Sequence, residues 1–422
     1  MSALFSNKLI IEYHDQTPVQ LIGPLHIQTP EFELWTQLFL LLLLQSAFSA
    51  VIGYVVYQVV VRRRLRNKNW WSSSQFPFGI IFGVVLPITI VFPFFVIWWL
   101  QIENRFLRMS LSTAPTLCSL RLLEAVAGYS PVGVETSLRT FVIYFASNCQ
   151  IVMDNLKSLS QPLPLKSNTG YLRRKGKSSF NSFVFLLVLF SICAPVEFIL
   201  FEERMLPNSM SHNIYELFQI NHLLNNFVAA LILQSLLTFG CEVIGFLIAL
   251  LFRLQTHLVF DNPVLASNSA ANFWGERWNL LVHGLLKRSI YKPSLRYGYS
   301  RTKAAMMTFI ASGILHEYVW LIMFYDGQLI VSPDLKVYEY FYGKSIIFFG
   351  WNGAIIMCEQ LLFSTQSAKN FDLLIPRYLK TALVLLAVLP ISHLFTGDWI
   401  EGKVFAGYMV GFPLLSIQAR NN

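Results

Sequence analysis

Two adjacent ionisable residues, His316 and Glu317, lie inside an apolar stretch of the sequence, where titratable side chains are costly to bury. The stretch from Lys303 to Phe324 is long enough for a membrane-spanning helix, and His316 lies roughly 20 Å from its start. Ser312 and Gly313 precede the histidine by about one turn, and their small side chains leave room for a substrate or a close helix. A histidine can accept a proton at neutral pH, so His316 is a candidate general base. A structural histidine bonded to another helix is the alternative, and residue types alone do not separate the two.

A second candidate segment, residues 271–283, is rich in aromatic and charged side chains. It is too polar to cross a bilayer, and its composition suits the membrane interface. Asn279 and His283 are four residues apart and would share one face of a helix. The segment's other candidate substrate contacts are Trp274, Arg277 and Trp278. An interfacial anchor without chemistry is the alternative interpretation.

The other histidines and the cysteines make weaker candidates. His222, His257 and His393 lie near the ends of apolar stretches, and these three, like His283, are more often packing or interface residues than catalytic ones. Neither an HxxxH nor an HExxH spacing occurs, so no metal site is predicted. The cysteines are odd in number and lack a CxxC pair, which predicts free thiols.

The composition predicts that these residues are positioned by a helical membrane body. Only 13% of the residues are charged, against about 25% in soluble domains, and 55% are hydrophobic, with a mean hydropathy of +0.51. A soluble enzyme, a disordered chain and a coiled coil are therefore excluded. We predict an all-α polytopic membrane protein with about nine transmembrane helices, in which a polar N-terminal segment (residues 1–33) precedes one membrane domain (residues 34–422). The predicted spans are 34–61, 76–100, 138–153, 180–201, 225–252, 303–324, 344–363, 379–394 and 403–417.

The basic residues predict the orientation of this body. They gather in three segments, residues 62–68, 166–177 and 253–303, which fall on the same side if the chain has nine spans. Cytosolic loops carry an excess of Lys and Arg, so the N-terminus is expected in the lumen and the C-terminus in the cytosol. Residues 170–179 are expected to form a flexible cytosolic loop, and the amphipathic residues 110–127 a re-entrant or interfacial helix.

The two motifs together resemble the wax synthase branch of the membrane-bound O-acyltransferases (MBOAT). That branch typically carries Asp-Phe-Trp-Gly-Arg-Arg-Trp-Asn, followed by Ser-Gly-x-x-His-Glu within a span. This chain has the first pattern at residues 272–279 and the second at residues 312–317, within a motif region of about residues 255–325. Asn272 stands where Asp is usual, and Glu276 stands where a basic residue is usual. These departures affect the finer substrate preference and any ion pair that the usual residues would make.

The resemblance implies a multi-pass enzyme of the endoplasmic reticulum that joins a long-chain alcohol to the acyl group of an acyl-CoA. It also implies His316 as the catalytic base and Asn279 as the second polar active-site residue. The chemistry agrees, because a base must take the alcohol proton as the oxygen attacks the thioester. An Asn amide could either stabilise the carbonyl oxygen or orient a substrate. The CoA thiolate is a good leaving group, so no metal or cofactor is expected beyond acyl-CoA as co-substrate.

The remaining predicted substrate-binding residues are Ser312 and Glu317 beside the histidine, and Lys287 and Arg288 in the third basic segment. The two cations, with Lys292 and Arg296, either contact CoA phosphates or serve only to set topology. The predicted partners are acyl-CoA, a long-chain alcohol and the bilayer, without nucleic acid. Diacylglycerol or a sterol is the alternative acceptor, and a proton-coupled transporter with a His-Glu relay is the alternative class. Transporters often contain internal repeats, and none is evident here.

Overall fold

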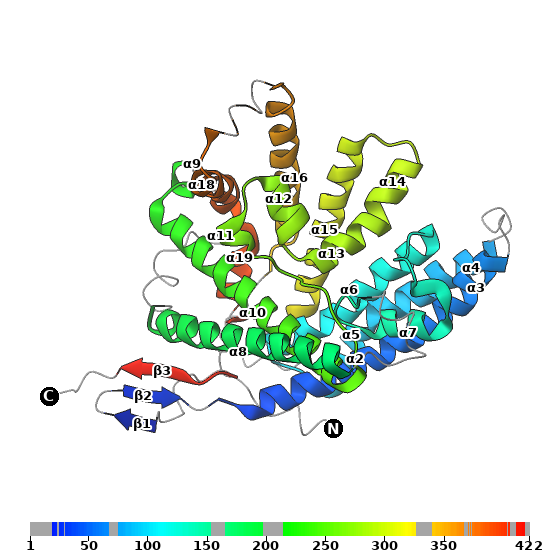
Figure 1. Cartoon of the computed structure of the whole chain (residues 1–422), viewed down its shortest axis with the longest axis horizontal. Coiled ribbons are helices and arrows are strands. Elements are labelled where there is room, and N and C mark those ends of the chain that lie inside the picture. The colour runs from blue at the N-terminus through cyan, green and yellow to red at the C-terminus, as the bar shows by residue number, and fades with distance from the viewer. Residues whose placement is uncertain are drawn as a thin grey trace.

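The computed structural model describes residues 19–22, 25–28, 30–66, 75–152, 165–196, 214–325, 340–366, 370, 372, 374–402, 404–405 and 411–417. Most of these residues are helical (Figure 1). The described chain also holds a small antiparallel sheet of order β1-β2-β3, made of Val19–Ile22, Leu25–Gln28 and Leu414–Ile417. The helical prediction is therefore confirmed for the membrane body, with this sheet as an addition.

Five helical stretches of the described chain are long and apolar enough to cross a membrane. They are Phe32–Arg66 (α2 Phe32–Val56, η1 Tyr57–Val61, α3 Arg62–Arg66), Pro77–Leu100 (within α4 Gln75–Ile80, η3 Ile81–Val85, α5 Leu86–Leu100), Ile220–Phe252 (α10), Arg301–Met323 (α15) and Lys344–Leu362 (α16). A sixth results if α18 (Arg377–Val388) with η9 (Leu389–Ile391) and α19 (His393–Glu401) form one span bent by 65°. The chain is thus a multi-pass membrane protein, but nine spans are not confirmed.

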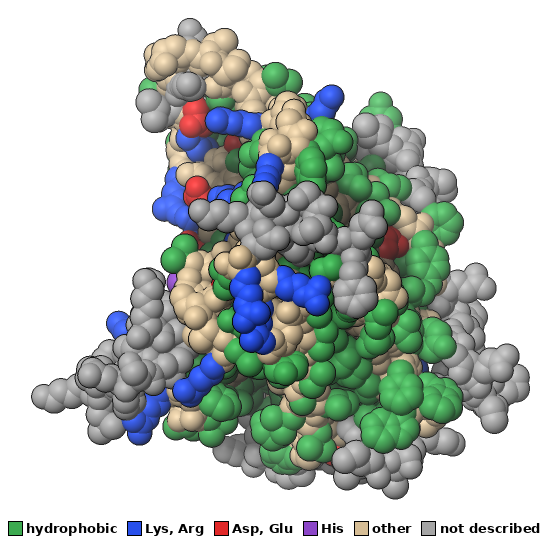
Figure 2. Space-filling view, turned by 90° about the vertical axis from the view of Figure 1, so that its right-hand side faces the viewer, with side chains coloured by type: hydrophobic (Ala, Val, Ile, Leu, Met, Phe, Trp, Pro, Cys, Tyr) green, Lys and Arg blue, Asp and Glu red, His purple; other side chains and the backbone are tan. Residues whose placement is uncertain are grey.

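Large hydrophobic side chains are exposed on the outer surface. Val91, Phe95 and Trp98 recur on one face of α5, and each is more than half exposed. Figure 2 shows a broad hydrophobic area on the lower part of one face, with Lys and Arg side chains gathered mainly above it. Exposed apolar surface of this extent suits contact with lipid.

Several predicted boundaries are wrong. Helix α7 covers only Leu138–Ala146, which is too short to span, because Ser137 begins it with a capping box and Ser147 ends it in an extended conformation. Residues 170–179 are not a loop but part of α8 (Leu165–Val196), where Lys175 pairs with Glu242 of α10 at 2.7 Å. The predicted last span, residues 403–417, lies partly outside the described residues and ends in β3.

Residues 110–127 form most of α6 (Arg105–Ala127), a helix that packs inside the protein beside α2, α5 and α15. Several of its polar residues are buried and make hydrogen bonds inside the protein, which explains the amphipathic pattern. Arg121, for example, donates to the carbonyls of Phe145 and Ser147 at 3.0 and 2.7 Å.

Helices α15 and α16 pack closely at two points. A Cβ at Gly313 would lie 2.7 Å from the Cα of Ile346, so only a glycine permits this approach. Glu317 accepts hydrogen bonds from the backbone N–H groups of Gly343 and Ser345 at 2.9 and 2.7 Å, at the start of α16. Carboxylates stabilise helix N-termini, so this contact fixes α16 against the helix that carries His316.

We predict that Gly313→Ala lowers the stability of the purified protein by about 1–3 kcal/mol, the usual cost of overpacking. Gly350→Ala is the matched control on α16, because its new Cβ would meet Ile310 at an ordinary 3.6 Å. Thermal unfolding in detergent measures both variants. Equal melting temperatures would show that the two helices can separate at no cost.

Candidate active site

The aromatic motif folds into a tight turn that presents its side chains to α15. Helix α12 (Ala270–Asn272) begins with Ser269, whose Oγ accepts from the N–H of Asn272 at 2.9 Å, and continues as the π-turn η7 (Phe273–Arg277). The chain then extends at Trp278 and reverses at Asn279, where φ is 40°. Asn tolerates this left-handed conformation better than most residues. Its Oδ1 accepts from the N–H of Val282 at 3.3 Å, so Asn279 caps α13 (Leu280–Leu286).

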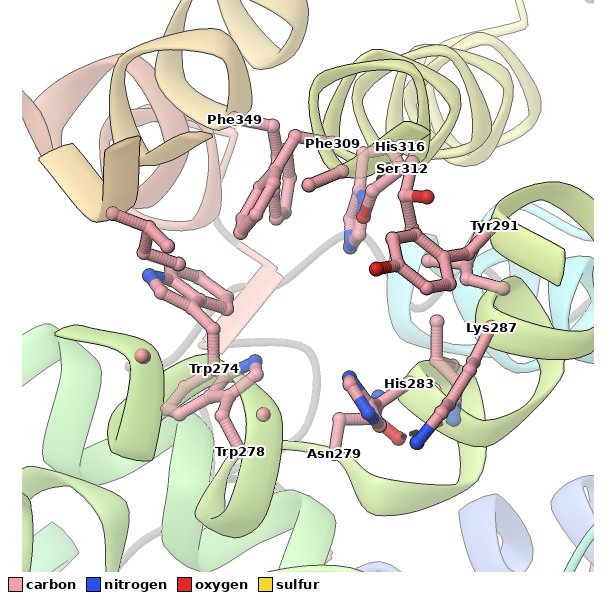
Figure 3. A pocket seen from close by; sticks show the side chains of 17 residues that line it. Trp274, Trp278, Asn279, His283, Lys287, Tyr291, Phe309, Ser312, His316 and Phe349 are labelled. Carbon is pink, nitrogen blue, oxygen red and sulfur yellow. Dashed lines mark hydrogen bonds between the residues drawn. The ribbon is translucent and has the colours of Figure 1, made fainter. Parts of the chain in front are cut away.

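This turn, α15 and α16 enclose a cavity of about 330 Å³ (Figure 3). The volume falls in the range of small-molecule sites. The sequence-predicted residues that line it are Trp274, Trp278, Asn279, His283, Lys287, Ser312 and His316. The structure therefore brings both candidate catalytic residues, which are distant in the sequence, to one space.

His316 points into this cavity from α15 (Figure 3). Its Nδ1 lies 2.7 Å from the carbonyl oxygen of Ser312. A carbonyl can only accept, so Nδ1 carries the hydrogen and Nε2 keeps its lone pair. The ring stacks on Phe349 at 4.4 Å and meets the edge of Phe395 at 5.2 Å. The imidazole is thus fixed in the tautomer that a general base requires.

The facing side of the cavity is polar. Asn279, His283, Lys287 and Tyr291 follow one another every fourth residue along α13 and the π-helix η8 (Lys287–Tyr291), and all four line the space. Burial, with the charges of Lys287 and then Arg288, lowers the pKa of His283 below its ordinary 6.5. His283 is therefore neutral at pH 7 and can accept or donate a hydrogen bond.

The opposite side is an aromatic wall formed by Trp274, Trp278, Phe309 and Phe349 (Figure 3). The Nε1–H of Trp274 donates to Oδ1 of Asn352 on α16 at 3.0 Å. One side of the cavity thus suits an apolar chain, while the other suits a polar group.

Three predicted substrate-binding residues do not line the cavity, because each is engaged elsewhere. Arg277 pairs with Asp261 at 2.9 Å, and Arg288 pairs with buried Glu124 at 2.6 Å. Glu317 points to the start of α16, where it also accepts from the hydroxyl of Tyr340 at 2.9 Å. The adjacent His316 and Glu317 therefore face different surroundings.

The two departures from the family motif bond to each other. Nδ2 of Asn272 donates to the carboxylate of Glu276 at 2.6 Å, and its Oδ1 accepts from Nε of Arg277 at 2.8 Å. Asn272 and Glu276 thus form a hydrogen bond at the two positions where an aspartate and a basic residue are usual. The turn keeps a polar link between these positions.

Three other histidines of the described chain, His222, His257 and His393, lie away from the cavity. His222 and His393 are buried with their rings 5.1 Å apart, and Nε2 of His222 lies 2.9 Å from the carbonyl of Pro390. His257 is exposed. Among the described residues, no group of His, Cys, Asp and Glu could hold a metal ion.

The sequence reasoning missed several lining residues. Tyr291 continues the four-residue spacing that begins at Asn279, so this spacing could have found it. Phe309 precedes Ser312 by one turn on α15, which is also a usable signal. Phe349 comes from α16, and no local pattern connects it to the motifs.

Comparison with known proteins supports the same region. Residues 256–332 match the model of the "Membrane bound O-acyl transferase family". Acyl-CoA–sterol O-acyltransferase 1 of Arabidopsis thaliana is 46% identical over 88 residues, 19% of this chain and 24% of the relative. Putative long-chain-alcohol O-fatty-acyltransferase 10 of the same plant is 31% identical over 118 residues, 26% of this chain and 32% of the relative. Diacylglycerol O-acyltransferase 1 of Chlorocebus aethiops is 45% identical over 53 residues, 13% of this chain and 11% of the relative.

These matches span about a third or less of the length of each relative. The family match at residues 256–332 includes both motifs, and several relatives are named as long-chain-alcohol O-fatty-acyltransferases, so the resemblance to the wax synthase branch of the membrane-bound O-acyltransferases is confirmed.

The lowered pKa of His283 predicts a specific pH dependence of stability. Between that pKa and 6.5 the unfolded chain binds a proton that the folded protein excludes, so stability falls as the pH drops through this window. When the pH is lowered from 7.5 to about 5.5, the melting temperature of His283→Gln should therefore fall by less than that of the unmodified protein. Exposed His257→Gln is the control, and an identical loss in all three proteins would contradict the prediction.

Proposed function

We propose that this protein is an acyl-CoA-dependent O-acyltransferase that esterifies a long-chain alcohol to a wax ester, with His316 as general base. The observation that carries the proposal is the shared cavity of His316 and Asn279, with an aromatic wall on one side and polar residues on the other. The named activities of the similar proteins support the same reaction class.

The geometry supports a direct attack mechanism. Nε2 of His316 takes the hydroxyl proton as the alcohol oxygen bonds to the thioester carbonyl carbon. The resulting oxyanion needs a donor, and the cap to Val282 turns Oδ1 of Asn279 to the backbone, which leaves Nδ2 as its donating end. The C–S bond then breaks, and the CoA sulfur leaves with the proton from His316. The reaction balances without a metal ion.

The two sides of the cavity suit the two parts of acyl-CoA. The apolar chains of both substrates would pack against the aromatic wall around Trp274. Lys287, beside His283, would attract the anionic CoA, whereas the Glu124 pair already neutralises Arg288.

Other acceptors belong to the same proposal. Similar proteins are named for a sterol, for long-chain alcohols and for diacylglycerol, so each acceptor must be tested. The transport alternative depends on a relay between His316 and Glu317. That relay has no support from the geometry, because the carboxylate caps α16 outside the cavity.

The experiment that tests the function gives purified protein one labelled acyl-CoA with primary alcohols of graded length, diacylglycerol and a sterol. We expect ester formation to rise with alcohol length and then fall. Shortening the best alcohol by four carbons should weaken apparent binding by up to about 3 kcal/mol. Ester with diacylglycerol or sterol alone would exclude the wax assignment, and no ester from folded protein would exclude the acyltransferase.

In the same assay, His316→Ala should lower kcat by about two to four orders of magnitude, the usual contribution of a positioned base. Exposed His257→Ala is the matched control. Near-normal turnover of a well-expressed His316→Ala protein would leave this histidine with a structural role.

Asn279→Gly should also lower kcat, because it removes the amide while glycine keeps the left-handed backbone. A change in KM alone would instead assign Asn279 to substrate placement.

We also propose the endoplasmic reticulum as the location, with the N-terminus in the lumen, the C-terminus in the cytosol and the basic segment 287–301 facing the cytosol. The excess of Lys and Arg in this segment supports the orientation. Tyr299 is 47% exposed there, so a cysteine replacing it should react with an impermeant maleimide on sealed microsomes. Reaction only after the membrane is opened would reverse the orientation.

A further inference from the structure

A second, smaller cavity lies behind the aromatic wall. It has a volume of about 40 Å³ and is enclosed by α10, α11 (Pro263–Ala266), α16, α18 and α19. Its lining is almost wholly apolar and includes Ala230, Leu385 and Leu389. Such a space can take hydrocarbon but offers little to a polar ligand.

The two cavities share part of their lining. Trp274, Trp278 and Phe349 contribute to both, so these rings form a partition between the reactive space and the smaller cavity. Trp274 is the central member of this partition. Its ring lies 5.6 Å from Phe349, 5.9 Å from Trp278 and 6.2 Å from Phe309.

Asn352 holds the indole of Trp274 in this position. It is 1% exposed on an apolar helix, where an amide is costly unless its polar atoms are bonded. Its Nδ2 donates to the carbonyl of Phe348 at 2.8 Å, which fixes the amide, and its Oδ1 accepts from Trp274 at 3.0 Å. The hydrogen bond selects one orientation of an otherwise apolar ring.

We infer that Trp274, positioned by Asn352, is the stop that limits how long an alkyl chain the enzyme accepts, and that the smaller cavity is the space a longer chain would fill. The inference rests on the proposed acyltransferase function. The ligand is an alkyl chain, which either the acyl group or the alcohol can supply.

The size of the smaller cavity sets the expected effect. A water-sized group needs about 10–15 Å³ by this measure, so the space holds about three methylene-sized groups. Each methylene that becomes buried should strengthen apparent binding about fourfold. Opening the partition should therefore move the preferred chain length upward by about three carbons.

The test uses two opening variants, Trp274→Ala and Asn352→Leu, and one filling variant, Ala230→Leu. Each purified protein is assayed with a graded series of acyl-CoA at one alcohol and then with graded alcohols at one acyl-CoA. We expect both opening variants to prefer longer chains in one of the two series, which identifies the chain. Ala230→Leu alone should leave the preferred chain length unchanged. Combined with either opening variant, it should return the preferred chain length to that of the unmodified protein.

The outcomes separate this inference from the proposed function. An unmodified protein that forms no ester overturns the function and the inference together. An active enzyme whose opening variants keep the original length optimum, with only a lower kcat, overturns the inference alone. If Trp274→Ala does not fold, Asn352→Leu is the deciding variant, because leucine is of similar size to asparagine and the protein keeps the Trp274 side chain, released from its hydrogen bond.

Discussion

The contact between Glu317 and the start of α16 holds the two helices on which the site depends. Glu317 accepts hydrogen bonds from the backbone N–H groups of Gly343 and Ser345 at the start of α16. Gly313, one turn earlier on α15, allows the two helices to approach closely. This pairing places His316 of α15 against Phe349 of α16. The motif turn then attaches to the same helix through Trp274 and Asn352. Because these links converge on α16, the pairing of α15 with α16 positions His316 relative to the aromatic wall.

The adjacent residues His316 and Glu317 differ in their surroundings. His316 faces the cavity with Nε2 available, while Glu317 is occupied by backbone and hydroxyl donors. Successive residues of a helix point about 100° apart, so one motif can serve chemistry and architecture together. The sequence alone therefore suggested two reactive groups, whereas in the structure only His316 faces the cavity and the Glu317 carboxylate holds α16 in place.

The sequence was most informative where chemistry is local. His316 was selected by residue type and surroundings and Asn279 by the family resemblance, and the structure brings them to one cavity, although their catalytic roles stay predictions. Tyr291 was within reach of the same reasoning, whereas Phe349 and Asn352 depend on how α16 packs. The prediction of a loop at residues 170–179 was wrong. Lys175 there pairs with Glu242 of α10, a helix distant in the sequence but packed against α8, so the charged segment is part of a helix. Hydropathy also failed for α7, whose end is set by the conformation at Ser147.

The left-handed backbone at Asn279 narrows the choice of residue at this position. Most side chains are strained at a φ of 40°, which favours Gly, Asn and Asp. In the proposed reaction glycine would have no group to donate, and an ionised aspartate would repel the negative charge that develops on the thioester oxygen. Asparagine alone among the three combines the required shape with a neutral donor. Under the proposed mechanism the residue at this position is therefore constrained twice, by backbone geometry and by electrostatics, and a substitution that meets one of these demands fails the other.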